Sequence, residues 1–158
     1  MDETYVKVGG QWAYLYRAID KNSETIGFML SPRRTAKSTR RFLGKALKLR
    51  EECLPETINT DQNEAYNKAI RALKRAGALE KSAQHRQVKY LNGQLEADHG
   101  ALKRLINPIR GFKSLPTASA TIKGFEVMRM IRKRQCLMLE SGAAGEVRFV
   151  NRLFRLAA

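Results

Sequence analysis

The chain of 158 residues contains little cysteine, histidine or proline and no long apolar run. Cys53 and Cys136 lie far apart without CxxC or Cys/His spacing, so we expect neither a structural zinc site nor a disulfide framework. Two histidines are too few for a histidine-based metal site. No apolar run approaches the ~18–20 residues of a membrane span. The N-terminus lacks the basic and apolar regions of a signal peptide. These absences predict a soluble, intracellular protein in a reducing cytoplasm.

Acidic residues are also scarce relative to basic ones. Thirty Lys and Arg residues oppose fifteen Asp and Glu residues, which gives a formal net charge of +15. This excess favours a polyanionic partner, most simply nucleic acid, over an anionic membrane or a merely basic surface. The length suits one domain with a real core, and a hydrophobic content of 43% favours a globular chain over a disordered one.

The hydrophobic pattern begins with a period of two and then changes to a helical period. Alternating runs predict an antiparallel meander of three strands at 3–8, 12–19 and 25–31. The elements expected after it are a helix over about 35–50, a strand at 57–60, a helix over 63–76, a strand within 85–91, a helix capped by Asn92 that runs to about 107, and a long helix over 117–139. This order predicts an α/β fold, with a mixed sheet covered by helices on both faces.

Three carboxylates fall at or near the ends of these expected elements. Asp2 begins the first strand, Asp61 follows the fourth, and Glu96 lies near the start of the helix after the fifth. If the first and fourth strands are neighbours, Asp2 and Asp61 lie side by side in a crevice at strand ends, and Glu96 can reach across. Clustered carboxylates repel one another unless cations share the site. Hard oxygen ligands select Mg²⁺ or Mn²⁺, and two such ions about 3.5–4 Å apart promote phosphodiester displacement.

Simpler explanations exist for each of these residues, and the spacing alone favours them. Asp2 can be a frayed terminal charge, Asp61 a helix N-cap, and Glu96 an exposed acid in a first helical turn. The aromatic residues Trp12, Tyr14 and Tyr16 alternate with smaller residues on one strand. Their pattern favours core packing over a base-stacking platform.

Several blocks of the chain resemble, in order and in register, the DDE transposases of bacterial insertion sequences, most closely the insertion sequence six family. These blocks are MDETYVKVGGQWAYLYRAID, INTDQNEAY, VKYLNGQLEADHGALKR and RGFKSLPTASATIKGFEVMRMIRK. The resemblance covers residues 1 to about 135 and includes the D-34-E spacing from Asp61 to Glu96. It implies an RNase H-like fold of the retroviral integrase superfamily with a mixed five-stranded sheet. It also implies that Asp2, Asp61 and Glu96 bind Mg²⁺ or Mn²⁺, as two ions.

The family resemblance further implies the bounds of the catalytic domain and the residues that contact DNA. Residues 1–140 are expected to form the catalytic domain, and 141–158 a C-terminal tail that can form a short helix. Lys103, the basic residue seven positions after Glu96, would position a DNA phosphate. Arg104 and His99 flank the same helical face, and a structural hydrogen bond is an equal alternative for His99.

The expected reaction is Mg²⁺-dependent cleavage at transposon ends followed by strand transfer into target DNA. The expected partner is DNA, bound by a homodimer or higher multimer in the bacterial cytoplasm, at the nucleoid. Complete family members carry a helix-turn-helix region before the first aspartate, which this sequence lacks. The alternative is therefore a truncated, catalytically inactive remnant that acts only as a basic DNA-binding domain.

Overall fold

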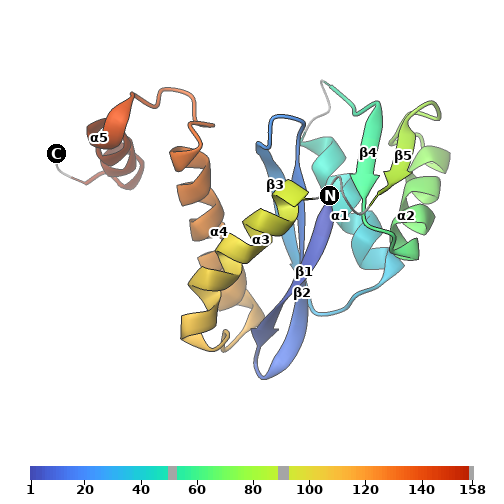
Figure 1. Ribbon diagram of the computed structural model, residues 1–158, viewed down its shortest axis with the longest axis horizontal. Coiled ribbons are helices and arrows are strands. Elements are labelled where there is room, and N and C mark those ends of the chain that lie inside the picture. Colours follow the sequence, from blue (N-terminus) through green and yellow to red (C-terminus); the bar gives the residue numbers. More distant parts are fainter. Residues whose placement is uncertain (50–52, 89–92, 157–158) are drawn as a thin grey trace. The chain divides into compact units, whose positions relative to one another are not determined.

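The computed structural model describes residues 1–49, 53–88 and 93–156, except the side chains of residues 94–96, 98 and 154. The first sheet is the antiparallel meander that the alternating pattern predicts (Figure 1). Its strands are β1 (Asp2–Val8), β2 (Gln11–Ile19) and β3 (Thr25–Ser31). Gly9 and Gly10 both have positive φ, as a tight turn between twisted antiparallel strands requires. The three predicted strands are confirmed to within one residue at each end.

A second sheet holds two parallel strands, β4 (Thr57–Thr60) and β5 (Gln84–Gln87). Helix α2 (Glu64–Arg75) makes the crossover between them. The structure thus has α/β architecture, but the described residues form sheets of three and two strands, not the continuous five-stranded sheet expected. The nitrogen of Met1 donates one hydrogen bond of 2.7 Å to the Asn59 carbonyl of β4. One such bond brings the sheets together but does not make the ladder of a shared sheet.

Helix α1 (Ala36–Lys48) packs between the two sheets and supplies side chains to both core clusters. Phe42 is fully buried with its ring centroid 5.7 Å from that of Tyr16 on β2. On the other side of α1, Leu43 and Leu47 pack with residues of β4 and α2. Burying each such side chain stabilises the fold by about 1.5–3 kcal/mol. The core therefore holds β1–β3 and β4–β5 in a fixed relation around α1.

Helix α3 (Gly93–Ile106) contacts β1 and continues into a short 3₁₀ turn, η2 (Asn107–Ile109), which contains Pro108. The chain then returns along β1, where Phe112 N donates to Lys7 O (2.8 Å) and Gly9 N donates to Phe112 O (2.7 Å). Gly111 has φ +109°, and a Cβ at this position would come within 2.9 Å of Lys7 O. Only glycine fits there, so this segment is fixed against the end of β1.

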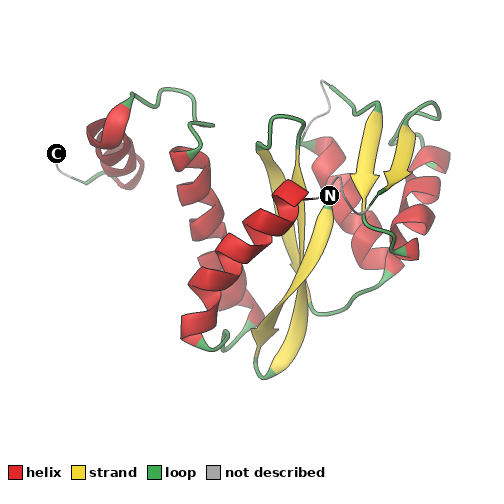
Figure 2. Ribbon diagram, viewed as in Figure 1, coloured by secondary structure: helices red, strands yellow, loops and turns green. Residues whose placement is uncertain are grey.

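The chain divides into two compact units, Met1–Ala120 and Thr121–Ala158. The boundary falls within α4 (Leu115–Arg132), which is shorter than the predicted helix over 117–139. The helix ends early because Arg134 adopts a left-handed conformation and Gln135 N donates to Met130 O (3.0 Å). The second unit also contains α5 (Gly142–Phe154), in the segment expected to form a tail (Figure 2). No helix in the described part of the chain is long and apolar enough to cross a membrane.

Candidate active site

Two of the three predicted carboxylates meet where β1 begins and β4 ends. Asp2 is the first residue of β1, and Asp61 directly follows β4. The hydrogen bond from Met1 to Asn59 brings these two points together. Burial, with the nearby negative charge of Asp61, raises the pKa of Asp2 to about 6, although a hydrogen bond from the Glu3 amide opposes the shift. The fold therefore holds two mutually repelling acids close together, partly out of water.

Local hydrogen bonds fix both carboxylates. Oδ1 of Asp2 accepts from the Glu3 backbone amide (2.8 Å), and Asp2 pairs with Arg17 in the strand register. Its side chain is only 14% exposed, so the frayed-terminus explanation is wrong. Oδ1 of Asp61 accepts from the backbone amide of Asn63 (3.1 Å). Asn63, not Asp61, is the N-cap of α2, since its side chain accepts from Ala65 N (3.0 Å).

The third predicted ligand, Glu96, belongs to α3 by its backbone, but its side chain lies outside the described residues. The predicted capping residue Asn92 lies outside them as well. Within the described part of the chain, no group of three or more His, Cys, Asp or Glu side chains could hold a metal ion. The triad therefore stays a prediction, of which the structure brings two members together.

His99 of α3 is buried against the first carboxylate. Its Nδ1 lies 3.7 Å from Oδ2 of Asp2. Burial, with the positive charges of Arg17 and Lys103 nearby, lowers the pKa of His99 to about 3. The imidazole is therefore neutral at neutral pH, and its contact with Asp2 is not an ion pair. Since only 6% of His99 is exposed, the structure favours its structural alternative over a DNA contact.

The two basic residues of α3 lie in different surroundings. Lys103 is half-buried, and its ammonium group lies 4.5 Å from the centroid of the Tyr5 ring on β1. This distance is within the range of a cation–π contact. Arg104 is exposed on the same helix. Both positive charges lie on the helix that carries His99 and Glu96, and the charge of Lys103 acts on His99.

A second set of polar residues, which the sequence reasoning missed, supports the carboxylates from the side of α2. Oε1 of Glu3 accepts from Nδ2 of Asn63 (2.9 Å) and pairs with Arg34. The Tyr66 hydroxyl is fully buried, and burial and the charges of Glu3 and Asp61 raise its pKa. The phenol therefore stays protonated. The one sequence signal for this set is the position of Glu3 beside Asp2, because Asn63 and Tyr66 look like ordinary residues at the start of a helix.

Comparisons with known proteins agree with this arrangement. A family of transposase domains, described as a DDE domain, matches residues 1–135 of the chain. The chain belongs to the DDE transposases. A DDE domain implies an RNase H-like fold, and the α/β architecture of the first unit agrees with it.

Curated relatives of this DDE domain include transposases of staphylococcal elements. The chain is 34% identical over 134 residues to the transposase for insertion sequence-like element IS431mec from Staphylococcus aureus. The matched region is 85% of this chain and 57% of that protein. The same figures hold for the transposase for insertion sequence element IS257 in transposon Tn4003, from the same species. An uncharacterized protein, pYV0051, from Yersinia pseudotuberculosis is 40% identical over 78 residues, 49% of this chain and 73% of that protein. These findings place the chain in the insertion sequence six family. No solved structure matches it.

Proposed function

We propose that this chain is the catalytic domain of a DNA transposase, which cleaves DNA at insertion-sequence ends and transfers the freed strand to target DNA. The observation that carries the proposal is that the carboxylates of Asp2 and Asp61 lie near each other inside the region that matches the DDE family. The proposed catalytic domain spans residues 1–140. We further propose that its two sheets correspond to one RNase H-like mixed sheet, in the order β3-β2-β1-β4-β5, joined where Met1 meets Asn59.

The carboxylates fit a hard divalent cation. Asp2 and Asp61 offer oxygen donors, and their mutual repulsion is the kind that a shared cation relieves. We propose Mg²⁺ or Mn²⁺ as the ion, with Glu96 completing a site for two ions. When bound, the ions would activate the attacking oxygen and stabilise the leaving oxygen of a phosphodiester.

The remaining residues of the site bind and orient. Buried His99 holds Asp2 against movement toward α3, since the two side chains are in contact. Lys103 positions a DNA phosphate beside the carboxylates, and exposed Arg104 contacts the DNA backbone. A net charge of +15 attracts DNA without regard to sequence. We propose that the chain works in the cytoplasm at the nucleoid, as a dimer or higher multimer that bridges two DNA ends.

Calorimetric titration with Mn²⁺ tests the metal site directly. We expect the 158-residue chain to bind Mn²⁺ and the Asp61→Asn variant to lose this binding. Glu64→Gln is the matched control, because Glu64 is an exposed carboxylate in the first turn of α2, three residues from Asp61. If the unaltered chain binds no more Mn²⁺ than the Asp61→Asn variant, the catalytic proposal fails. The alternative of an inactive DNA-binding remnant then replaces it.

A further inference from the structure

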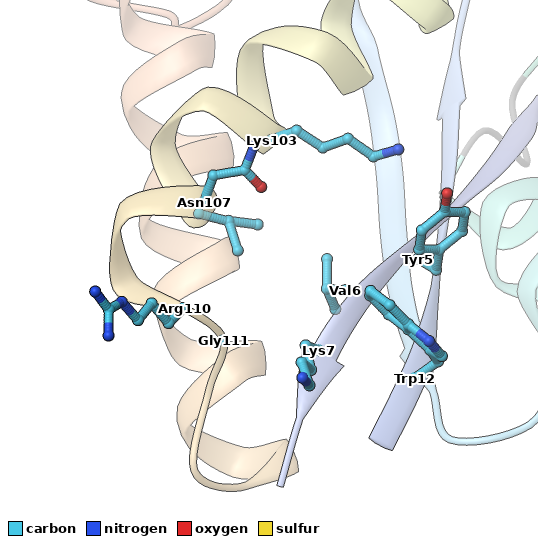
Figure 3. A pocket seen from close by; sticks show the side chains of 9 residues that line it. Tyr5, Val6, Lys7, Trp12, Lys103, Asn107, Arg110 and Gly111 are labelled. Carbon is cyan, nitrogen blue, oxygen red and sulfur yellow. The ribbon is translucent and has the colours of Figure 1, made fainter. Parts of the chain in front are cut away.

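A cavity of about 380 Å³ lies beside β1, between the β1–β2 hairpin and the end of α3 (Figure 3). Its wall includes the side chains of Tyr5, Val6, Trp12, Lys103 and Ile106, and the backbone at Gly111. The volume lies within the ~300–1,000 Å³ range of pockets for small ligands. Every one of these residues belongs to the first compact unit. We call this cavity the aromatic pocket.

Two aromatic rings of the pocket are exposed to solvent. Trp12 is 57% exposed and Tyr5 is 52% exposed. Their ring centroids lie 5.0 Å apart at an interplanar angle of 78°, so the two rings are nearly perpendicular, in an edge-to-face arrangement. The expectation that Trp12 packs in the core is wrong, whereas Tyr16 on the same strand is fully buried. The difference arises because α1 covers the sheet at Tyr16 but does not extend to the hairpin.

The charged side chains that line the pocket are all positive. Lys103 reaches across the pocket with its ammonium group 4.5 Å from the Tyr5 ring centroid (Figure 3). Lys7 and Arg110 line the rim, and none of the described residues that line the pocket is acidic. An aromatic surface edged by cations fits a ligand with a flat ring system and an anionic group. A nucleotide has both, a base that stacks and a phosphate that pairs with lysine.

The pocket is built on fixed backbone and lies close to the carboxylates. Next to Gly111, the backbone of Phe112 is hydrogen-bonded to Lys7 of β1 and to Gly9 of the turn, which holds that wall in place. Tyr5 is three residues along β1 from Asp2, which corresponds to about 10 Å of strand, and the two side chains project to opposite faces of the strand. Lys103 connects the two faces, because its ammonium group lies over the Tyr5 ring. Lys103 is one helical turn from His99, which contacts Asp2. A strand of DNA whose phosphate is at the carboxylates therefore has a neighbouring base within reach of the pocket.

We propose that the aromatic pocket binds an unpaired nucleotide of the DNA substrate, with its base against Trp12 and Tyr5 and its phosphate at Lys103. In a duplex, both faces of a base are covered by its neighbours, so stacking on a protein ring requires a base that has left the helix or a single-stranded end. The inference rests on the proposed function, since it takes DNA as the substrate. It adds that the domain engages a base as well as the phosphate backbone beside the carboxylates.

Trp12 is the only tryptophan of the chain, so its fluorescence reports on the pocket directly. The 158-residue chain is titrated with a short oligothymidine, with an abasic strand of the same length and charge, and with a blunt duplex. Anisotropy of a dye on each DNA records binding in parallel. We expect the oligothymidine to quench Trp12 by stacking, while the abasic strand and the duplex bind without quenching. Equal quenching by the abasic strand, or no quenching at saturation with oligothymidine, would overturn the inference.

The parallel anisotropy signal separates this failure from a failure of the proposed function. If the duplex binds but no DNA quenches Trp12, the pocket inference fails and DNA remains the partner. If no DNA binds at all, the proposed function fails and the pocket inference fails with it.

Variants provide a second, independent measurement. Trp12→Leu should weaken oligothymidine binding about tenfold and leave duplex binding unchanged, while Trp12→Phe keeps a stacking ring and loses less. Leu105→Ala is the control, because Leu105 is a similarly exposed apolar residue on α3 that does not line the pocket. Circular dichroism of each variant shows whether the fold is retained. A loss in Trp12→Leu that is equal for oligothymidine and duplex would count against base stacking.

Discussion

The two halves of strand β1 carry opposite chemistry. At its start, Asp2 lies half-buried beside Asp61, in a setting that favours cations. Farther along, Tyr5 lies exposed among Trp12 and lysines, in a setting that favours an anion with a flat ring. One strand thus separates a group of negative charge from a group of positive charge by a few residues. A basic chain can therefore attract DNA and still keep an acidic centre for metal.

The largest effect is expected from a substitution that alters only the acidic start of β1. Asp2→Asn removes one charged oxygen donor, so we expect Mg²⁺-dependent cleavage of DNA carrying insertion-sequence ends to fall by at least ~100-fold, because the loss of even an outer-shell partner of a metal ligand costs about 10–100-fold. Binding to oligothymidine without metal should stay the same, because Asp2 does not line the aromatic pocket. Gel assays of cleavage and anisotropy in EDTA measure the two. An equal loss in both assays would mean that the two halves of β1 do not act separately.

The next largest effect is expected from a backbone change beside the aromatic pocket. Gly111→Ala places a Cβ within 2.9 Å of Lys7 O at φ +109°, so we expect unfolding to become easier by about 1–3 kcal/mol. Urea denaturation measures this change. Gly124→Ala in α4 is the control, since a Cβ there meets nothing within 4 Å and alanine favours helix. A Gly111→Ala variant as stable as the unaltered chain would show that the segment against β1 is not under this constraint.

A smaller effect separates phosphate contacts from stacking. Lys103→Gln removes one cation from the pocket, so the slope of log K against log salt for oligothymidine should become shallower by ~0.7 for the one lost phosphate contact on a single strand. Quenching of Trp12 at saturation should persist, because both rings remain. Lys81→Gln, an exposed lysine outside the pocket, is the comparison variant. Equal slopes for Lys103→Gln and the unaltered chain would remove Lys103 from the phosphate contacts.

The smallest effect concerns the strands that support Asp61. Burial and the nearby charge of Lys74 lower the pKa of His85, whose Nε2 lies 2.8 Å from the Thr60 hydroxyl, next to Asp61. Because the pKa of His85 is lower in the folded state, neutral His85 contributes its full stabilisation of the fold above pH 6.5. This contribution to the free energy of unfolding is lost as the pH falls below 6.5. We expect the Tm to decrease between pH 7 and pH 5, and less so in His85→Gln. An unchanged pH dependence in His85→Gln would assign the effect to other groups.

The pattern of hydrophobic residues predicted many of the helices and strands, because the strands follow the alternation of apolar and polar residues closely. The meander of β1–β3, the helix α1 and the strand before Asp61 all depend on residues near in sequence, and each lies within one or two residues of its predicted place. The pattern could not show how far a neighbouring element reaches. Trp12 and Tyr16 share one alternating face, yet only Tyr16 lies under α1.

The site shows the same limit. The positions of Asp2 and Asp61 at strand ends could be predicted, because strand ends are visible in the pattern. Glu3 and Tyr66 could not, since they meet near the carboxylates through side chains that are distant in sequence. The end of α4 at Arg132 depends on one residue, Arg134, whose left-handed backbone no periodicity indicates.

Asn63 makes three hydrogen bonds: its backbone amide donates to Asp61, its side-chain Oδ1 accepts from Ala65 N in the first turn of α2, and its Nδ2 donates to Glu3. The short stretch between β4 and α2 therefore sets the spacing of a carboxylate relative to a helix. Surface loops usually accept added residues. A single residue inserted between Asp61 and Asn63 would instead break the first connection while α2 kept its cap. The length of this loop thus sets where the Asp61 carboxylate lies relative to α2.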